Sequence, residues 1–216
     1  LECPGLITVD GKQILMFSPQ GLAPDRVHHR YENIHNTGYV IGTFDETTAR
    51  FQVETDFEEV DQGFEFYAPQ TMNAPDGRRI MWGWAGMMTP EREAADWVHV
   101  LTVPRALHVT ADNHLVQQPI QEILAPTVLD IQSLDHLTVG QYRVQTDADW
   151  SVALGDYATL KRVGQTLYFE RQQWEDHRLD TRQMTGNLDE LLLIVDNDVI
   201  EVYTEDGLQV MTGRYF

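Results

Sequence analysis

The sequence predicts an all-β protein. Short runs rich in aliphatic and aromatic residues, such as "KQILMFS", "TGYVIGTFD" and "RRIMWGWAG", alternate with turn sequences such as "DG", "DETT" and "APDG". The runs follow one another at intervals of about a dozen residues and mostly show period 2, which is typical of propeller blades, a barrel or a sandwich. In this half of the chain, 89–96 ("TPEREAAD") has the best helix signals, for one or two turns, because Thr89 can cap it and Pro90 suits its first turn.

The first half of the chain is expected to contain strands at 12–18, 37–45, 49–55, 64–72, 78–86 and 98–109. In 78–86, period 2 places Trp82 and Trp84 on one face, and Gly83 between them allows a close backbone neighbour. The same alternation places Glu65 and Tyr67 together on one face of 64–72.

A change of character at "QQPIQEILAPTVLD" predicts a domain boundary, where Pro119 and Pro126 bracket one possible helical turn. We expect one domain over 1–119, a linker over 120–126 and a second domain over 127–216. Strands are expected in the second domain at 140–146, 150–155, 158–163, 165–172, 190–196, 198–207 and 208–216. Seven short antiparallel strands, with Gly207 supplying a positive φ in the last hairpin, are the signature of a β-sandwich.

The net charge of −19, from 34 acidic and 15 basic residues, repels nucleic acid and anionic membranes, so neither is an expected partner. The single cysteine excludes an internal disulfide and fits a reducing compartment, so we expect a cytoplasmic protein. No apolar run approaches the roughly 18 residues that a membrane-spanning helix requires.

The opening Glu2-Cys3-Pro4 has residue types that suit acid–base chemistry. Pro4 fixes its own φ and favours extended geometry at Cys3, so the tripeptide is expected to leave the sheet as a stiff strand end. A carboxylate held beside a thiol and a proline ring is poorly solvated, as a general acid near neutral pH requires. The alternative is that Glu2 is an ordinary solvated charge near a chain end.

Exposed indoles beside carboxylates commonly bind the apolar faces of sugar rings, so the tryptophans of 78–86 are candidate sugar contacts. The alternative is that both belong to the core. His28, His29 and His35 suggest a metal site, but no matching cysteine or carboxylate spacing supports one. We therefore expect neither a metal nor another cofactor.

Six motifs, taken in order, resemble glycoside hydrolase family 32, which contains the invertases, the sucrose-6-phosphate hydrolases and other β-fructofuranosidases. They are "ECP" followed by "LMFSPQG", then "TGYVIGTFD", "DQGFEFYAPQTM", "GRRIMWGWAG", "W-x3-LTVPRAL" and "L-x-Q-x-P-x-x-E". Their order and spacing match the family across most of 1–125, and "LLLIVDNDVIEVYTEDGLQVMTGRYF" resembles the end of its C-terminal sandwich.

The resemblance implies a partial five-bladed β-propeller, comprising about the last two blades, followed by a C-terminal β-sandwich. It assigns the general acid/base of a retaining hydrolase to Glu2, a sugar-facing position to Cys3 and an aromatic wall to Trp84. The segment "EFYA" matches the family's Asp-Phe-Tyr-Ala and adds Glu65 and Tyr67 as substrate contacts, although Glu65 replaces the usual Asp. The glycine after "ECP" also departs from the family's usual Asp or Asn.

The family's nucleophile motif, Trp-Met-Asn-Asp-Pro-Asn-Gly, and its Arg-Asp-Pro motif are both missing from the 216 residues. We therefore expect the C-terminal part of a β-fructofuranosidase that acts on sucrose or sucrose 6-phosphate, inactive by itself because retaining hydrolysis needs two carboxylates. Exposed propeller faces and edges are expected to promote self-association.

Two other functions stay open. The sandwich could be a non-catalytic module that binds fructan, using the aromatic residues Trp150, Tyr157, Tyr168 and Trp174. The parent enzyme could also transfer the fructosyl group to another sugar instead of to water. The choice between sucrose and its 6-phosphate depends on basic residues at the rim of the site, for which Arg26, Arg30, Arg78 and Arg79 are the candidates.

Overall fold

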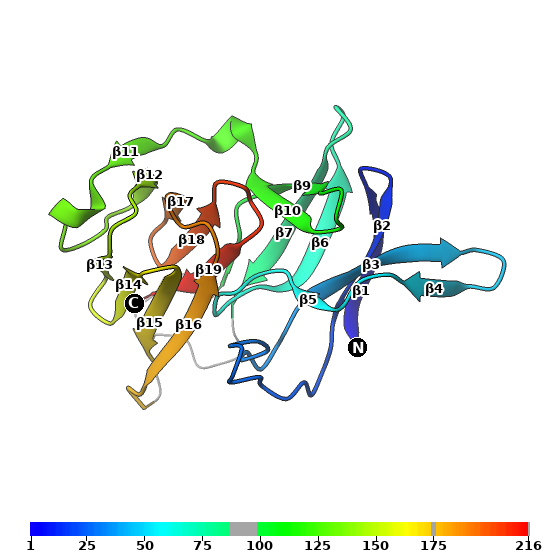
Figure 1. The fold of residues 1–216 in the computed structure, drawn as a ribbon, viewed down its shortest axis with the longest axis horizontal. Helices are drawn as coiled ribbons and strands as arrows, with labels where there is room; N and C mark the ends of the chain where they lie inside the picture. The colour runs from blue at the N-terminus through cyan, green and yellow to red at the C-terminus, as the bar shows by residue number, and fades with distance from the viewer. Residues whose placement is uncertain (87–98, 174–175, 216) are drawn as a thin grey trace.

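The computed structural model describes residues 1–86, 99–173 and 176–215, which form four β-sheets and two short 3-10 helices (Figure 1). The predicted helix at 89–96 lies outside these residues. The first half contains β1 (Glu2–Val9), β2 (Lys12–Ser18), β3 (Gly38–Asp45), β4 (Arg50–Val53), β5 (Glu58–Glu59), β6 (Tyr67–Asn73), β7 (Arg79–Ala85), β8 (Val100–Leu101), β9 (Arg105–Val109) and β10 (Leu115–Pro119). The second half contains η1 (Gln121–Ile123), β11 (Thr127–Leu129), η2 (Ile131–Ser133), β12 (Gly140–Gln145), β13 (Trp150–Leu154), β14 (Ala158–Val163), β15 (Thr166–Gln172), β16 (Leu179–Thr185), β17 (Glu190–Val195), β18 (Val199–Thr204) and β19 (Val210–Arg214).

The first two sheets share one apolar core. Their strand orders are β1-β2-β3-β4, with β5 beside β3, and β10-β9-β7-β6, with β8 beside β7. All their pairings are antiparallel. Alternation along the strands directs one face of each sheet into the core, which contains Ile7, Ile14, Met16, Ile41, Met81, Leu107 and Leu115.

The other two sheets share a second core. Their orders are β11-β12-β17-β18-β19 and β13-β14-β15-β16; β11 pairs with β12 in parallel, and the other neighbouring strands of these orders pair antiparallel. The core between them contains Leu154, Leu160, Phe169, Leu191, Leu193 and Val202. The aliphatic side chains that alternate along these strands account for this burial.

Several predicted elements are confirmed. β2 coincides with the expected strand at 12–18, and η1 is the single helical turn expected between Pro119 and Pro126. The hairpins β17–β18 and β18–β19 are present, with Gly207 at φ 69°. The strands β5, β10, β11 and β16 were not predicted, and β1 was expected only as a strand end at 2–4.

β16 escaped prediction because its sequence, "LDTRQMT", is mainly polar. Its central Arg182 is nevertheless only 8% exposed. The guanidinium donates from Nε to Asn33 Oδ1 (2.8 Å) and from Nη2 to the carbonyl of Glu32 (3.1 Å), and it lies 4.5 Å from the centre of the Phe64 ring. Tertiary hydrogen bonds thus bury a residue that a hydropathy pattern assigns to the surface.

Arg105 lies in a buried polar network that joins the first half of the chain to the second. Its side chain is 0% exposed, and its Nη2 lies 3.1 Å from Asp61 Oδ2 and 2.8 Å from Glu201 Oε2. The same nitrogen donates to the Thr212 hydroxyl at 2.6 Å, and Nη1 donates to Gln117 Oε1 at 3.1 Å. A buried cation requires such partners, because desolvation would otherwise disfavour its charge.

The segment before β6 also follows the edge of β19. The backbone N–H of Gln62 donates to the carbonyl of Val210 (2.8 Å), and the N–H of Glu65 donates to the carbonyl of Thr212 (3.2 Å). Gly63 is required there, because a Cβ atom would lie 1.8 Å from the Thr212 carbonyl oxygen. The two halves are therefore joined through the backbone as well as through side chains.

Glu59 is a carboxylate whose ionisation opposes folding. Both of its oxygens accept the backbone N–H of Tyr31 at 3.1 Å. Burial raises the pKa of Glu59 to about 6, although the Tyr31 N–H and the charges of Arg30 and Arg182 act in the opposite direction.

No helix within the described residues is long and apolar enough to cross a membrane.

We predict that Arg105→Met lowers the free energy of unfolding by about 3–5 kcal/mol, because it leaves two buried carboxylates without their cation. The matched control is Arg78→Met, which removes a half-buried arginine that also bridges two carboxylates, those of the exposed Asp76 and Glu122, at 2.6 and 2.5 Å. Exposed pairs contribute about 0–1 kcal/mol each. Urea titration monitored by circular dichroism measures both losses, and equal losses would contradict the assigned role of Arg105.

We predict that Glu59→Gln stabilises the protein more at about pH 7.5 than at about pH 4.5. A carboxyl whose pKa rises on folding, from 4.5 to about 6, destabilises the native state when ionised, and this cost disappears as pH falls through that interval. Melting temperatures of both proteins at both pH values test this, with Glu46→Gln on the exposed β3–β4 turn as the control for net charge. A pH-independent difference would contradict the prediction.

Candidate active site

Glu2 and Tyr67 are joined by a hydrogen bond, in which the Tyr67 hydroxyl donates to Glu2 Oε2. Each residue is the first of a strand, Glu2 in β1 and Tyr67 in β6, and these strands belong to different sheets. The bond therefore ties together the ends of two neighbouring sheets. Two of the predicted site residues, far apart in sequence, meet here.

The strand bearing Glu2 contains a bulge. Its register with β2 shifts between Glu2 and Gly5, and Cys3 within the bulge has φ 49°. The expected extended geometry of Cys3 is wrong, because the bulge imposes a left-handed conformation that outweighs the preference set by Pro4. Bulges of this kind redirect the side chains next to them, and Glu2 is the residue that this one redirects.

The strand bearing Tyr67 contains the same kind of bulge. Its register with β7 shifts between Tyr67 and Gln70, Ala68 has φ 48°, and Pro69 follows. The two hydrogen-bonded side chains thus each precede a positive-φ residue and a proline. Because proline has no N–H for the ladder, strand pairing is interrupted at both places and the side chains before them can leave their sheets.

The surroundings of the pair differ from the sequence prediction in one respect. Glu2 is exposed, so the poorly solvated carboxylate expected beside Cys3 and Pro4 is not formed by the described residues. Tyr67, by contrast, is only 7% exposed. Burial raises the pKa of Tyr67 to about 12, and the hydrogen bond to Glu2 and the charge of Glu2 act in the same direction. The phenol therefore stays protonated and remains the donor in this bond.

Aromatic rings surround Tyr67. Trp84 meets it edge to face at 6.1 Å between ring centres, and His99 stacks on Trp84 at 4.7 Å with 13° between the planes. His35 lies 5.1 Å from the Tyr67 ring, and its Nδ1 is buried with no hydrogen-bond partner among the described residues. The sequence singled out Trp84 and Tyr67 but did not place the two histidines in the site. The pairing of β8 with β7 brings His99 there, which the motif alone does not reveal.

Gly83 does have a close neighbour, but this is the Phe66 ring and not the backbone that we predicted, because a Cβ atom at Gly83 would lie 2.3 Å from that ring. The predicted common face of Glu65 and Tyr67 is wrong, because β6 begins only at Tyr67. Glu65 is 2% exposed; it accepts from Arg171 Nη2 at 2.5 Å and from the backbone N–H of Arg214 at 2.7 Å. Both of its oxygens bind to the C-terminal sheets, so Glu65 is a residue of the junction rather than of the Glu2–Tyr67 pair.

No group of three or more His, Cys, Asp or Glu side chains suited to a metal ion is found among the residues that the structure describes. His28 instead lies 2.7 Å from the carboxylate of Asp25, and His35 lies beside Tyr67. Cys3 is a half-buried free thiol next to Glu2. The described site is thus one carboxylate with a phenol, a thiol and an aromatic wall.

Residues 1–119 match the family model of the glycosyl hydrolases family 32 N-terminal domain. The chain is 29% identical to a sucrose-6-phosphate hydrolase of Bacillus subtilis and 31% identical to one of Salmonella typhimurium, and both matches cover 100% of the chain, but only 49% and 47% of these relatives. The chain therefore spans about half the length of the curated relatives that it matches.

Among solved structures, a GH32 beta-fructofuranosidase of Bombyx mori is 25% identical and superposes with a TM-score of 0.72, covering 100% of this chain and 49% of that one. The same enzyme has been solved as a mutant in complex with sucrose, with the same TM-score and coverage. The family model alone covers more than half of the chain, and the relatives agree with it. The chain belongs to glycoside hydrolase family 32.

Proposed function

We propose that the chain forms part of a retaining β-fructofuranosidase that hydrolyses sucrose or sucrose 6-phosphate, with Glu2 as its general acid/base. The observation that carries this proposal is the hydrogen bond from Tyr67 to Glu2, which holds a carboxylate beside an aromatic wall at the ends of two sheets. Membership of family 32 supports the reaction class. The sucrose complex of the Bombyx mori relative supports the substrate class.

In the proposed reaction, Glu2 donates a proton to the glycosidic oxygen as the glucosyl group leaves. In the second step the same carboxylate takes a proton from water, which then attacks the fructosyl-enzyme bond. The nucleophile must be a second carboxylate about 5–5.5 Å from the first. The family resemblance places it in a motif that the 216 residues do not contain, so we propose that this chain alone does not turn over substrate.

The proposed substrate contacts follow from the geometry around Glu2. The Tyr67 hydroxyl contacts the carboxylate, and the half-buried Trp84 ring next to Tyr67 offers an apolar surface that suits the C–H face of a fructosyl ring. Cys3 adjoins the carboxylate within the bulge. Glu65 has no direct part in this proposal, because both of its oxygens bind the C-terminal sheets.

We further propose that the two sheets of the first half are blades of a five-bladed propeller and that the other two form a sandwich. The separate cores of the two pairs of sheets support this division. The proposed boundary places the propeller part at 1–119, the linker at 120–126 and the sandwich at 127–216. The end of the family match at Pro119 and the helical turn η1 support this boundary.

Two of the four aromatic residues that suggested a fructan-binding sandwich give it no support. Trp150 is 6% exposed and belongs to the core, and Trp174 lies outside the described residues. Tyr157 and Tyr168 remain on the outer side of the β13–β16 sheet. A transferase in place of a hydrolase has no specific support from the described residues, and hydrolysis is therefore the function that we propose.

The test is glucose release from sucrose and from sucrose 6-phosphate. We expect none from the 216-residue chain, and release once it is fused to the segment of the Bacillus subtilis relative that it does not match. In that fusion Glu2→Gln is expected to lower the rate by about 10²–10⁴-fold, because it removes the proton donor. Glu46→Gln, on an exposed turn, is the control and is expected to keep the rate.

Sustained release by the chain alone, abolished by Glu2→Gln, would show that these residues supply both carboxylates and would contradict the proposed inactivity. A folded, active fusion that is indifferent to Glu2→Gln would overturn the assignment of Glu2. A fusion that folds but releases no glucose from either sugar would contradict the proposed activity.

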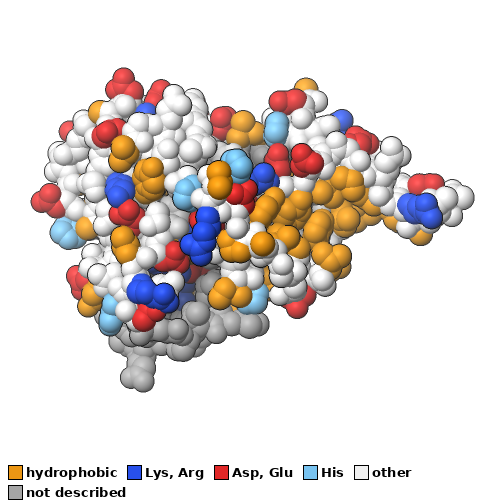
Figure 2. Space-filling model, turned by 60° about the horizontal axis from the view of Figure 1, so that its bottom comes forward, with side chains coloured by type: hydrophobic (Ala, Val, Ile, Leu, Met, Phe, Trp, Pro, Cys, Tyr) orange, Lys and Arg blue, Asp and Glu red, His pale blue; other side chains and the backbone are white. Residues whose placement is uncertain are grey.

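We also propose that the isolated chain self-associates through the outer face of the β1–β4 sheet. One side of this sheet carries apolar residues that lie outside its core, namely Leu6, Leu15, Phe17, Val40, Phe44, Phe51 and Val53, and Phe57 packs on it against Phe17. Leu6 is 44% exposed and Val53 is 54% exposed. Figure 2 shows a continuous hydrophobic patch next to the projecting β3–β4 hairpin. Patches of this kind promote association.

We predict a concentration-dependent sedimentation coefficient in the micromolar range. Leu6→Lys is expected to weaken association by about tenfold or more, because it would bury an unpaired charge. Val128→Lys, at a residue that is 75% exposed in β11, is the matched control and should change nothing. A chain that stays monomeric at all accessible concentrations, or equal effects of both variants, would contradict the proposal.

A further inference from the structure

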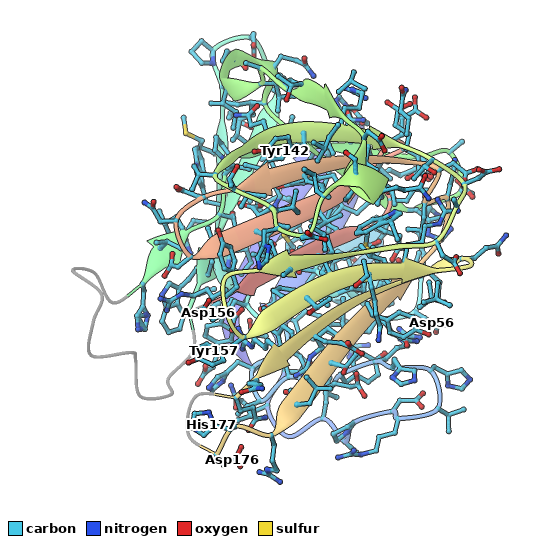
Figure 3. The ribbon with its side chains drawn as sticks, turned by 90° about the vertical axis from the view of Figure 1, so that its left-hand side faces the viewer. Asp56, Tyr142, Asp156, Tyr157, Asp176 and His177 are labelled. Carbon is cyan, nitrogen blue, oxygen red and sulfur yellow. The ribbon has the colours of Figure 1, made fainter. Side chains whose placement is uncertain are left out.

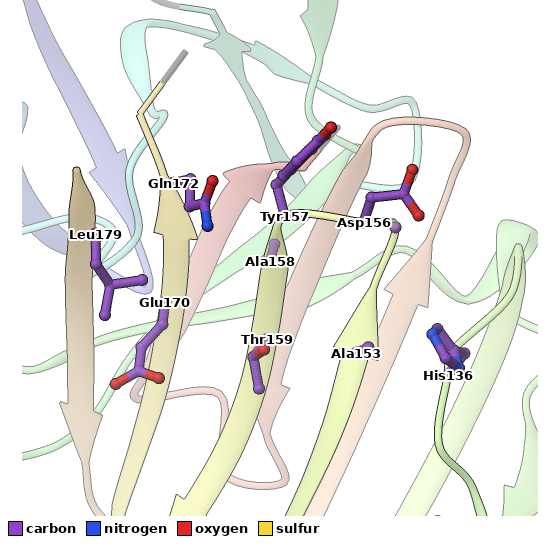
Figure 4. A pocket seen from close by; sticks show the side chains of 10 residues that line it. His136, Ala153, Asp156, Tyr157, Ala158, Thr159, Glu170, Gln172 and Leu179 are labelled. Carbon is purple, nitrogen blue, oxygen red and sulfur yellow. The ribbon is translucent and has the colours of Figure 1, made fainter. Parts of the chain in front are cut away.

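The C-terminal half contains a cavity far from the Glu2–Tyr67 pair in the topology. It has a volume of about 310 Å³ and lies on the outer side of the sheet formed by β13–β16. Figure 3 shows Asp156 and Tyr157 at one end of that sheet, in the turn between β13 and β14, and Figure 4 shows the cavity from nearby. Cavities that hold small ligands measure about 300–1,000 Å³, so its size suits a single ring.

Small side chains form the floor of the cavity. Leu154 and Leu160 point into the core, so the alternate residues Ala153 and Thr159 face outward. Ala153 lies opposite Thr159, which lies opposite Glu170 on the next strand, and Figure 4 shows this row. Two short side chains between longer neighbours leave the sheet surface hollow.

The walls of the cavity are held by backbone hydrogen bonds. Along the edge of β13, the N–H of Ala153 donates to the carbonyl of Asp135 (2.8 Å), and the N–H of Leu137 donates to the carbonyl of Ala153 (2.9 Å). These bonds fix His136 at one rim. On the other side, the N–H of Gln172 donates to the carbonyl of Tyr157 at 2.9 Å, which sets their side chains next to each other. The cavity is therefore formed before any ligand binds.

The lining combines an aromatic ring with neutral hydrogen-bonding groups. Tyr157 is 42% exposed, and Leu179, 64% exposed, adds an apolar surface on the neighbouring strand. Gln172 offers an amide and Thr159 a hydroxyl, each of which can donate and accept hydrogen bonds. A sugar ring has the matching chemistry, because its C–H face is apolar and its hydroxyls both donate and accept.

The charges around the cavity favour a neutral ligand. The carboxylate of Glu170 is bound by Lys161 Nζ at 2.6 Å, so this acid is already compensated. Asp156 is exposed at the rim, and the whole chain carries a net charge of −19. A phosphate or carboxylate group would approach this rim against repulsion.

We propose that the cavity beside Tyr157 binds one ring of a neutral saccharide. The site goes beyond the proposed catalytic function and does not depend on it, because it lies on β13–β16 while Glu2 and Tyr67 open β1 and β6. It would hold a sugar on the sandwich side of the enzyme without reacting with it.

The experiment is a titration of the whole 216-residue chain, labelled with ¹⁵N, with sucrose and separately with sucrose 6-phosphate, followed by NMR. We expect sucrose to shift the amide signals of the turn at 155–159 and of Gln172, and sucrose 6-phosphate to bind there more weakly. Tyr157→Ala is expected to weaken sucrose binding by about tenfold, which corresponds to about 1.4 kcal/mol. Ala153→Leu, which fills the floor, should abolish it.

Tyr168→Ala is the matched control, because this tyrosine lies on the same sheet face but does not line the cavity, and it should leave binding unchanged. Glu2→Gln should also leave it unchanged, which separates this site from the proposed catalytic one. The proposal is overturned if no signals around the cavity move, if Tyr157→Ala binds sucrose as the unchanged chain does, or if sucrose 6-phosphate binds there at least as tightly as sucrose.

Discussion

The buried guanidinium of Arg105 is the constraint on which the arrangement of the chain depends. It binds Asp61 from the first half and Glu201 from the second, and it also reaches the hydroxyl of Thr212. Hydrogen-bonded ion pairs are directional, so a small shift of one pair of sheets against the other would break them, whereas apolar packing is not directional. The pair of sheets that carries Glu2 is thereby held in one orientation against the pair that carries the cavity beside Tyr157.

The segment "GFEFY" extends this constraint to three arginines. The Phe64 ring lies 4.0 Å from the guanidinium of Arg171 and 4.5 Å from that of Arg182, and the Phe66 ring lies 4.7 Å from that of Arg105. Aromatic faces stabilise cations whose water has been removed. The segment that leads into Tyr67 is therefore fixed from the C-terminal side, and the position of the Glu2–Tyr67 pair depends on residues in both halves.

Sequence alone predicted most strands, because alternation of apolar residues is a local signal that burial on one face requires. It also selected Glu2, Tyr67 and Trp84, which the structure brings together. It failed where tertiary contacts override local preference. Glu65 was assigned to a strand face but is bound by the other half, and polar β16 was not recognised as a strand. Long-range ion pairs and positive-φ bulges do not change the alternation of apolar and polar residues, so this pattern cannot predict them.

The segment before β6, which contains Gln62 and Glu65, ties the C-terminal sheets to the first half of the chain through backbone hydrogen bonds. By pairing with Val210 and Thr212, the segment covers backbone groups of β19, the last strand of its sheet. Removing residues 1–119 would expose that edge, remove the cation from Glu201 and leave Arg171 without its acid. The C-terminal sheets are thus not a self-contained unit, since the edge of β19 is hydrogen-bonded by a segment of the first half of the chain.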